Sequence, residues 1–421
     1  MKMNLKPLVP AILAALSTLP VQAVDFTGYV RSGLGISNNG GGVKGGDELA
    51  KSKLGRLGNE FDTYSEIGLG QELYQEEGKS FYFESMFAMS ADGNLESEET
   101  TKDTANFAIK QLNLQAKGFI AAAPEATIWA GKRFYQRHDL HIIDTKYWNI
   151  SGYGFGVEGL NLGSGALSAA IIRGDQDDLN INYLDIRYAG FSPWQGAWTE
   201  FGIDYALPNP TDSEKESGKD FDNGLMLTAE LSQSFSRGYN KTVLQYADSG
   251  LAQNMISQGG GWFDAWTGDV NSAKGYRIIN TGDFTLSEKI SFNHVLTYGY
   301  AKNHGDVWVD AGNNIWEHRI YKDEDLFSAV IRPQYAWSKH HKTVLELGYY
   351  TQTRTSKSGV EDKSGGQKFT VAQVLSAGEY LFVRPEMRLY ASYLKDNEEK
   401  SFNDGRDQDD IKFGVQIEAW F

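Results

Sequence analysis

Histidines and a carboxylate gather in one short segment of the chain. His138, Asp139 and His141 have the side-chain types of a metal site. A zinc site needs several ligands that converge on the ion and further hydrogen bonds that hold those ligands in place. No second cluster of suitable residues accompanies these three in the sequence. We therefore predict no metal site here and no cofactor.

Two acidic stretches offer oxygen ligands of the kind that Ca²⁺ prefers. They are Asp175-Gln176-Asp177-Asp178 and the segment from Asp404 to Asp410. Neither has the spacing of a complete calcium-binding loop. We interpret both as solvated loops, and loop-bound Ca²⁺ stays an open alternative.

The sequence gives little support for catalysis. A serine hydrolase needs a serine, a histidine and an acid within reach of one another, and no serine here lies in a nucleophile-elbow motif. Glu66 and Asp139 could form the carboxylate pair of a glycosidase, but that reaction depends on a separation that sequence does not give. The glycine runs 40–42 and 259–261 lack the strand and helix that flank a phosphate-binding loop. We predict that the protein is not an enzyme.

Composition excludes several other classes. The 421 residues include 55 Asp+Glu against 40 Lys+Arg, for a net charge of −15, so the chain has no electrostatic reason to bind nucleic acid. The absence of cysteine excludes a disulfide framework. With 10 Trp, 22 Tyr and 22 Phe, the chain has too many aromatic residues for a disordered protein.

Residues 1–23 have the features of a secretory signal peptide. Lys2 and Lys6 precede an apolar run from Leu8 to Leu19, and Val21 and Ala23 are small residues before a cleavage site at Val24. A short membrane anchor is the alternative, but the apolar run is too short to cross a bilayer. No run of about 20 apolar residues follows residue 23, which excludes a helical membrane protein. We expect one domain over residues 24–421.

The mature chain alternates between apolar and polar residues in many short runs, which is the signature of β-strands. Examples are the runs 111–117, 200–205, 344–349, 388–393 and 413–421. Turn clusters such as Asn223-Gly224 separate them. Longer polar segments, which we predict to be loops, lie at 35–53, 90–105, 208–222, 249–275, 302–324, 354–366 and 396–410.

An all-β chain of this kind either packs its apolar face inward as a soluble sandwich or turns it outward to lipid as a membrane barrel. The barrel is favoured by aromatic groups near strand ends (81–83, Tyr298 with Tyr300, Tyr349 with Tyr350), by a charged second face, and by a final Phe421 on the apolar side of its strand. At roughly 22 residues per strand and connection, the length gives about 18 antiparallel strands. A barrel of that size leaves an aqueous channel, and we expect a loop folded inside to narrow it.

Several motifs together resemble the maltoporins, the trimeric sugar-specific porins of the Gram-negative outer membrane. They are VDFTGYVRSGLG from Val24, GRLGNEFDTYSEIGLGQEL (55–73), WAGKRFYQRHDLHIIDTKYWNISG (129–152), LTAELSQSF (227–235), GYNK (238–241), RPEMRLYASY (384–393) and the terminal IEAWF. The resemblance implies a homotrimer, contacts of the barrel with membrane lipid and lipopolysaccharide, and facilitated diffusion of maltose and maltodextrins together with ion passage.

In that family, an aromatic ladder and a polar track along the lumen bind the two sides of a sugar. An aromatic plane stacks on the C–H face of the ring, and charged groups hydrogen-bond its hydroxyls. The resemblance places the ladder at Tyr29, Tyr64, Tyr239, Phe382 and Trp420. It places the track at Arg31, Arg56, Glu66, Lys110, Arg137, Asp139, Asp144 and Lys146, with Arg137 to His141 in the constriction loop. Strand alternation independently puts Tyr29 with Arg31, Tyr64 with Glu66, and Trp420 with Gln416 and Glu418.

The sequence also departs from the family pattern. No Trp occurs between residues 24 and 128, where the family has a Trp that reaches the neighbouring subunit's pore. Lys146 stands where the family has a constricting Tyr, and the cysteine pair of some members is absent. These differences leave the preferred sugar open. The alternatives are a porin of the same scaffold for sucrose or β-glucosides, or a general diffusion porin.

Overall fold

In the computed structural model of the chain, the described residues are 24–43, 48–93, 95–175, 179–265, 270–310 and 316–421. The signal peptide predicted over residues 1–23 lies outside them and stays a prediction. Within these ranges, no helix is long and apolar enough to cross a membrane.

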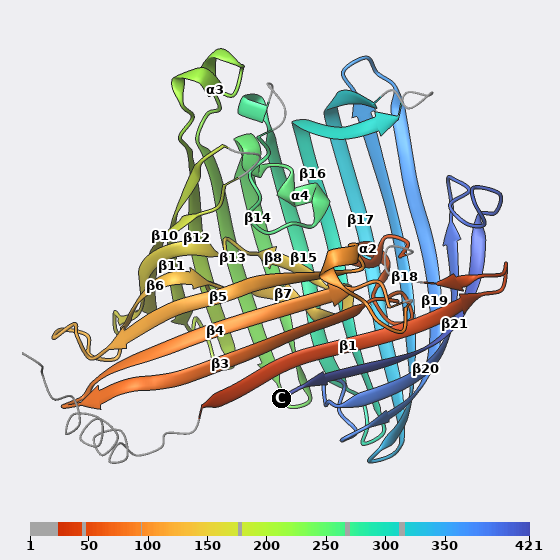
Figure 1. The fold of residues 1–421 in the computed structure, drawn as a ribbon, viewed down its shortest axis with the longest axis horizontal. Coiled ribbons are helices and arrows are strands. Elements are labelled where there is room, and N and C mark those ends of the chain that lie inside the picture. Colours follow the sequence, from red (N-terminus) through yellow and green to blue (C-terminus); the bar gives the residue numbers. More distant parts are fainter. Residues whose placement is uncertain (1–23, 44–47, 94, 176–178, 266–269, 311–315) are drawn as a thin grey trace, which may run out of the picture.

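The strands form one antiparallel sheet that closes on itself (Figure 1). Neighbours in the chain pair with one another, and β1 closes the barrel by pairing with β3 on one side and β21 on the other. The barrel has 18 strands, as predicted. They are β1 (Asp25–Ser37), β3 (Thr63–Glu76), β4 (Lys79–Ala91), β5 (Ala105–Lys117), β6 (Thr127–Arg133), β9 (Gly152–Asn161), β10 (Ala166–Arg173), β11 (Ile181–Phe191), β12 (Ala197–Pro208), β13 (Gly224–Phe235), β14 (Gly238–Asp248), β15 (Lys274–Thr285), β16 (Ile290–Asp310), β17 (Trp316–Ser338), β18 (His341–Ser356), β19 (Glu361–Ser376), β20 (Glu386–Asp396) and β21 (Asp409–Trp420).

Short elements lie in the connections. They are β2 (Gly42–Val43), α2 (Lys51–Leu54), η1 (Thr100–Lys102), β7 (His138–Leu140), η2 (His141–Ile143), β8 (Thr145–Trp148), α3 (Asp212–Glu216), η3 (Ser249–Leu251), α4 (Asn254–Ser257) and η4 (Val270–Ser272). β7 and β8 pair only with each other, as a small second sheet inside the barrel (Figure 1).

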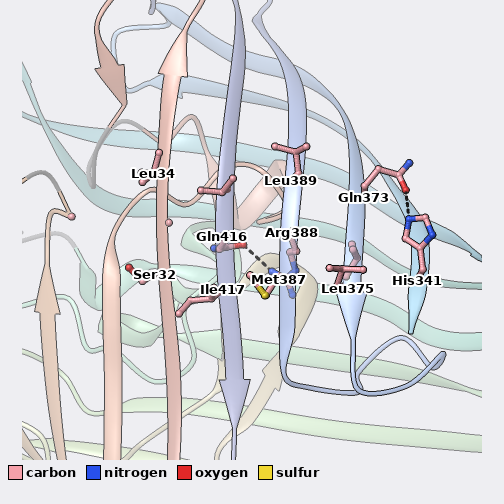
Figure 2. A pocket seen from close by; sticks show the side chains of 14 residues that line it. Ser32, Leu34, His341, Gln373, Leu375, Met387, Arg388, Leu389, Gln416 and Ile417 are labelled. Atoms are coloured by element: carbon pink, nitrogen blue, oxygen red, sulfur yellow. Dashed lines mark hydrogen bonds between the residues drawn. The ribbon is translucent and has the colours of Figure 1, made fainter. Parts of the chain in front are cut away.

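Successive residues of each barrel strand point to opposite faces, with apolar side chains outside and polar side chains inside. In β21, Val415 and Ile417 are exposed, whereas Gln416 and Glu418 are buried. Figure 2 shows the outer face at β1 and β19–β21, where Leu34, Leu389 and Ile417 border a shallow groove of about 520 Å³. On the inner side of the same strands, the Arg388 guanidinium donates to Gln416, N to O 2.8 Å. This is the orientation predicted for a membrane barrel.

Three connections fold into the barrel and build its core. They are residues 48–62 with α2, residues 134–151 with β7 and β8, and residues 249–265 with α4. The largest buried apolar cluster joins Ile142, Tyr147 and Trp148 to Met255 and Phe263, and includes residues of β12–β17. Residues 249–265 therefore belong to the barrel interior, and the inward constriction loop predicted to include Arg137 to His141 is confirmed.

Three local predictions were wrong. The polar segment 354–366 was expected to be a loop, but all of it except 357–360 belongs to β18 and β19, which pair as far as Thr355↔Glu361. The polar segment 302–324 was expected to be a loop, but the β16–β17 ladder continues through it, from Lys302↔Asp323 to Asp310↔Trp316. β17 has 23 residues, which is more than the roughly 9–11 that cross a bilayer, and a hairpin in water needs no apolar face. Tyr350 was assigned to the lipid interface, but it faces inward and packs with Leu54 of α2. Only its neighbour Tyr349 is exposed outside.

Candidate functional site

Two adjoining cavities inside the barrel contain every residue predicted for the site. The first, of about 550 Å³, is lined by Tyr29, Tyr64, Trp420, Arg31, Arg56, Glu66, Lys110, Arg137, Asp139, Asp144 and Lys146, together with Phe134, His141 and Asn149. The second, of about 300 Å³, includes Tyr239, Phe382, Trp420, Asp139, His141 and Lys241. Trp420, His141 and Asp139 border both cavities, so they lie at the boundary between them.

Strand register brings three of the aromatic residues together. Tyr29 of β1 lies opposite Trp420 of β21, and Arg31 of β1 lies opposite Tyr64 of β3. The rings of Tyr29 and Tyr64 are 6.2 Å apart between centroids. Because the three strands are neighbours, Tyr29, Tyr64 and Trp420 lie on one part of the inner wall, where all three line the first cavity. Tyr239 comes from β14, and Phe382 from the connection between β19 and β20.

The polar ends of these aromatic residues are held by charged groups. The Tyr29 hydroxyl accepts from the Arg56 guanidinium at 2.7 Å and donates to Glu418 at 2.8 Å. The Tyr64 hydroxyl donates to Glu66 at 2.5 Å. The Arg384 guanidinium carbon lies 4.5 Å from the ring centroid of Trp420. Each ring is thus fixed beside a charge, as a site with apolar and polar sides requires.

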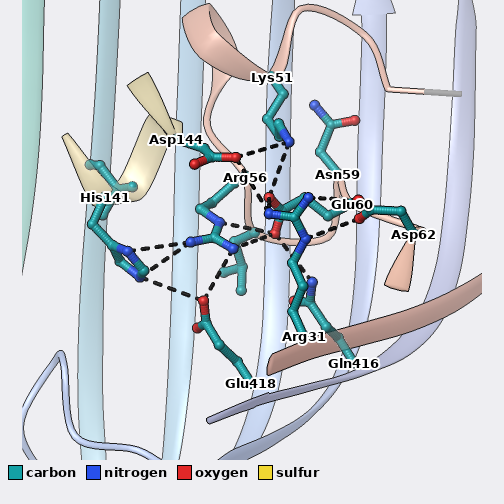
Figure 3. A network of polar contacts seen from close by, with 12 residues as sticks. Arg31, Lys51, Arg56, Asn59, Glu60, Asp62, His141, Asp144, Gln416 and Glu418 are labelled. Atoms are coloured by element: carbon teal, nitrogen blue, oxygen red, sulfur yellow. Dashed lines mark hydrogen bonds and ion pairs between the residues drawn. The ribbon is translucent and has the colours of Figure 1, made fainter. Parts of the chain in front are cut away.

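A buried network of charges attaches two of the inward connections to the barrel wall (Figure 3). They are residues 48–62 and the constriction segment, residues 134–151. The Arg56 guanidinium lies 2.9 Å from Glu60 and 3.1 Å from Glu418 of β21. Arg31 of β1 lies 3.1 Å from Glu60. Lys51 lies 3.2 Å from both Glu60 and Asp144. The network therefore connects residues 51–60 to the constriction segment and to the seam between β1 and β21.

Neighbouring cations lower the pKa of two carboxylates in the inward connections, Glu60 and Asp144. Burial by itself would raise the pKa of Glu60, but the cations Arg56, Arg31 and Lys51 outweigh it and lower that pKa. The pKa of Asp144 is also lowered, because Lys146 and Arg56 outweigh its burial. Lys146 donates to Asp144 at 2.7 Å while it lines the first cavity.

The constriction segment packs its apolar side against the wall and turns its charged side to the channel. The Trp148 indole donates to Asp204 of β12 at 2.7 Å, and the Arg187 guanidinium carbon lies 3.7 Å from its ring centroid. The backbone oxygen of Tyr147 accepts from Arg277 at 3.0 Å. These anchors leave Arg137, Asp139 and Lys146 at the first cavity.

Sequence analysis placed His141 in the constriction loop and weighed it as a metal ligand, but did not include it among the sugar-binding residues. Its ring meets those of Phe382 and Trp420 edge-on, with centroids 5.6 Å apart in both cases. Arg137, Asp139 and His141 alternate in sequence, and all three line the first cavity. The period-two pattern would therefore have placed His141 correctly. His138 points the other way and joins Glu200 and Glu230 instead of Asp139 and His141.

Comparison with known proteins agrees with this architecture. The family model described as LamB porin matches residues 24–421. The chain is 52% identical to maltoporin 1 of Aeromonas salmonicida over 446 residues, covering 100% of both chains. It is 51% identical over 438 residues to maltoporin 2 of Yersinia pseudotuberculosis, again with 100% of each chain covered.

Solved structures support the fold alone. OccK1 of Pseudomonas aeruginosa matches with a TM-score of 0.52 at 12% identity, covering 94% of this chain and 99% of that chain. OccAB2 of Acinetobacter baumannii matches with a TM-score of 0.51 at 9% identity, covering 94% and 98%. The chain therefore belongs to the LamB porin family and is a sugar-transporting β-barrel of the Gram-negative outer membrane.

Proposed function

We propose that the channel carries maltose and maltodextrins by facilitated diffusion along the aromatic and charged residues that line the two cavities. The observation that carries this proposal is the position of Trp420, which borders both cavities, with Tyr29 and Tyr64 on one side and Phe382 and Tyr239 on the other. A glucan chain could thus remain stacked on one ring while it moves to the next. No covalent step and no cofactor is needed.

Charged side chains supply the exchange of hydrogen bonds that movement requires. Arg137, Asp139 and Lys146 lie on the constriction segment. Glu66 of β3 and Lys110 of β5 line the same cavity from the barrel wall. Donors and acceptors are therefore mixed along the path, which suits sugar hydroxyls, since each both donates and accepts. Binding at such a site must be weak enough to allow release.

Planar-bilayer recording with a panel of sugars tests the proposal. We expect maltotriose and longer linear maltodextrins to block the ion current saturably, and sucrose and aryl-β-glucosides to block it much less. Equal or stronger block by sucrose or an arylglucoside would assign the channel to that sugar. Lys146 gives this alternative its basis, because a flexible cation there replaces a flat stacking surface. Absence of block by any sugar would indicate a general diffusion porin.

We also propose that three copies assemble in the membrane, on the basis of the resemblance to trimeric porins. Chemical crosslinking of the protein in native outer membranes tests this. We expect crosslinked products that contain up to three chains. If the largest product contains only one or two chains, the proposed trimer is contradicted.

A further inference from the structure

Two glutamates lie directly opposite each other under the constriction segment. Glu200 of β12 and Glu230 of β13 are cross-strand partners, and they are only 4% and 1% exposed. Like charges directly opposite in a sheet destabilise it, and buried carboxylates need a compensating cation. The pair therefore requires positive charge from another element.

Lys241 and His138 are the cations in reach. The Lys241 ammonium, on β14, lies 3.1 Å from Glu230 and so compensates one of the two carboxylates. The His138 ring has Nδ1 2.8 Å from Glu230 and Nε2 3.5 Å from Glu200. A neutral imidazole has one N–H and can donate to only one of them, whereas an imidazolium donates to both and balances the second negative charge.

The other groups around His138 do not replace that proton. The Tyr147 hydroxyl donates to Glu230 at 2.8 Å but carries no charge. The Trp148 ring centroid lies 5.1 Å from that of His138, but an indole is uncharged. Its charged neighbours, Asp204 and Arg187, contact Trp148. The adjacent Arg137 and Asp139 have opposite charges and line the channel.

A divalent cation fits this cluster less well than a proton. The side chains of His138, Glu200 and Glu230 bring ligand atoms within 4.8 Å of one another. However, the two ring nitrogens face different carboxylates, whereas a metal would need both carboxylates to converge on one nitrogen's lone pair. Lys241 also already lies beside Glu230, and its charge would repel a second cation.

We propose that His138 is a positioning residue of the constriction: as an imidazolium it ties the segment to β12 and β13 and so holds Arg137 and Asp139 at the channel. Any effect on sugar block rests on the proposed function, whereas the effect on ion conductance does not. Burial alone would lower the pKa of His138, but its hydrogen bonds with Glu200 and Glu230 outweigh burial and raise it.

The sign of the pH dependence follows from that raised pKa. The contact is complete below the ordinary histidine pKa of 6.5 and is lost as the pH rises through the higher value in the folded protein. We therefore expect single-channel conductance without sugar to change on alkaline titration. His138→Gln should show at pH 7 the conductance that the wild type reaches only at high pH. In Glu200→Gln, the pH midpoint of the conductance change should lie about 1 unit or more below that of the wild type.

The control is His340→Gln, which removes an exposed histidine from the turn before β18 and should leave the profile unchanged. Nuclear magnetic resonance of the His138 ring nitrogens in the wild-type protein gives a second measurement that does not depend on any variant folding. An imidazolium at neutral pH is expected. Titration of His138 at or below pH 6.5, or identical conductance profiles for the wild type and His138→Gln, would overturn the proposal.

Discussion

His141 and Trp420 meet edge to face at the junction of the two cavities, with ring centroids 5.6 Å apart and ring planes at 83°. One residue comes from the inward segment and the other from the closing strand of the barrel. Their contact therefore lies where the two cavities meet, on the path that we propose for the sugar.

Replacement of Trp420 by alanine should weaken sugar binding without reducing ion flow. Loss of one stacking surface is worth about 0.5–1.5 kcal/mol, or roughly 2- to 12-fold in the maltotriose concentration for half-block. Conductance should stay similar or rise. Trp337→Ala is the control, because Trp337 is exposed on the outer face. Unchanged block in Trp420→Ala would remove this residue from the sugar path, and Tyr64→Ala tests Tyr64 in the same way.

Replacement of Lys146 by tyrosine should lower single-channel conductance, because a rigid ring would enter the first cavity. Asp144 would keep Lys51 at 3.2 Å and Arg31 at 3.4 Å as partners, so the segment should stay in place. Lys146→Met separates charge from shape, since it should change ion selectivity with little effect on conductance. A conductance in Lys146→Tyr equal to or above that of the wild type would show that residue 146 does not narrow the pore.

Acid should weaken the ion pairs that hold residues 48–62 inside the barrel, because it protonates Glu60. Because its pKa is lowered in the folded protein, the stabilisation is complete above the ordinary value of 4.5 and is lost as the pH falls through the folded value. The unfolding temperature in detergent should fall in that range. Glu60→Gln should cost about 3–5 kcal/mol at neutral pH, since it leaves buried cations without their carboxylate.

The matched control for Glu60 is Glu99→Gln. Glu99 pairs with Lys102 on the surface, at 2.8 Å, and exposed pairs contribute about 0–1 kcal/mol. If the two variants unfold at the same temperature at neutral pH, the inner network does not stabilise the barrel.

The lipid-facing surface can be tested at Leu244 of β14, which is exposed outside. Leu244→Lys should destabilise the folded barrel in phospholipid vesicles by about 2–4 kcal/mol if the residue lies near the bilayer centre. Leu244→Phe keeps an apolar group at the same depth and should unfold at nearly the same urea concentration as the wild type. Equal stability of the two variants would place this face out of contact with lipid.

Alternation of polar and apolar residues along single strands predicted which side chains share a face of the barrel wall. Period two alone puts Gln416 and Glu418 on one face and Val415 and Ile417 on the other, because a strand has only two faces. The choice of a membrane barrel over a sandwich then puts the polar pair inside. The same rule placed Tyr29 with Arg31. The resemblance to known sugar porins was needed to select which aromatic residues lie in the lumen, since Tyr349 and Tyr350 look alike in sequence and face opposite sides.

The inward connections were harder to predict because their partners are distant in sequence. Nothing near Glu60 in the sequence indicates that it meets Arg31 or that it shares Arg56 with Glu418. Alternation separates His138 from His141, but it does not show that His138 meets Glu200 of β12 and Glu230 of β13. The outer part of the β16–β17 hairpin was missed because residues 302–324 are mostly polar in sequence and have no apolar alternation.

The pairing of β1 with β21 also constrains how the molecule is made. Tyr29 and Glu418, which share a hydrogen bond across this seam, are 389 positions apart, so the ring of strands cannot close until nearly the whole chain is available. Before closure, both outermost strands carry unpaired peptide groups that hydrocarbon does not tolerate and that invite association between chains. Entry into the bilayer should therefore be all-or-none, and variants that weaken the seam should accumulate as aggregates rather than as narrower pores.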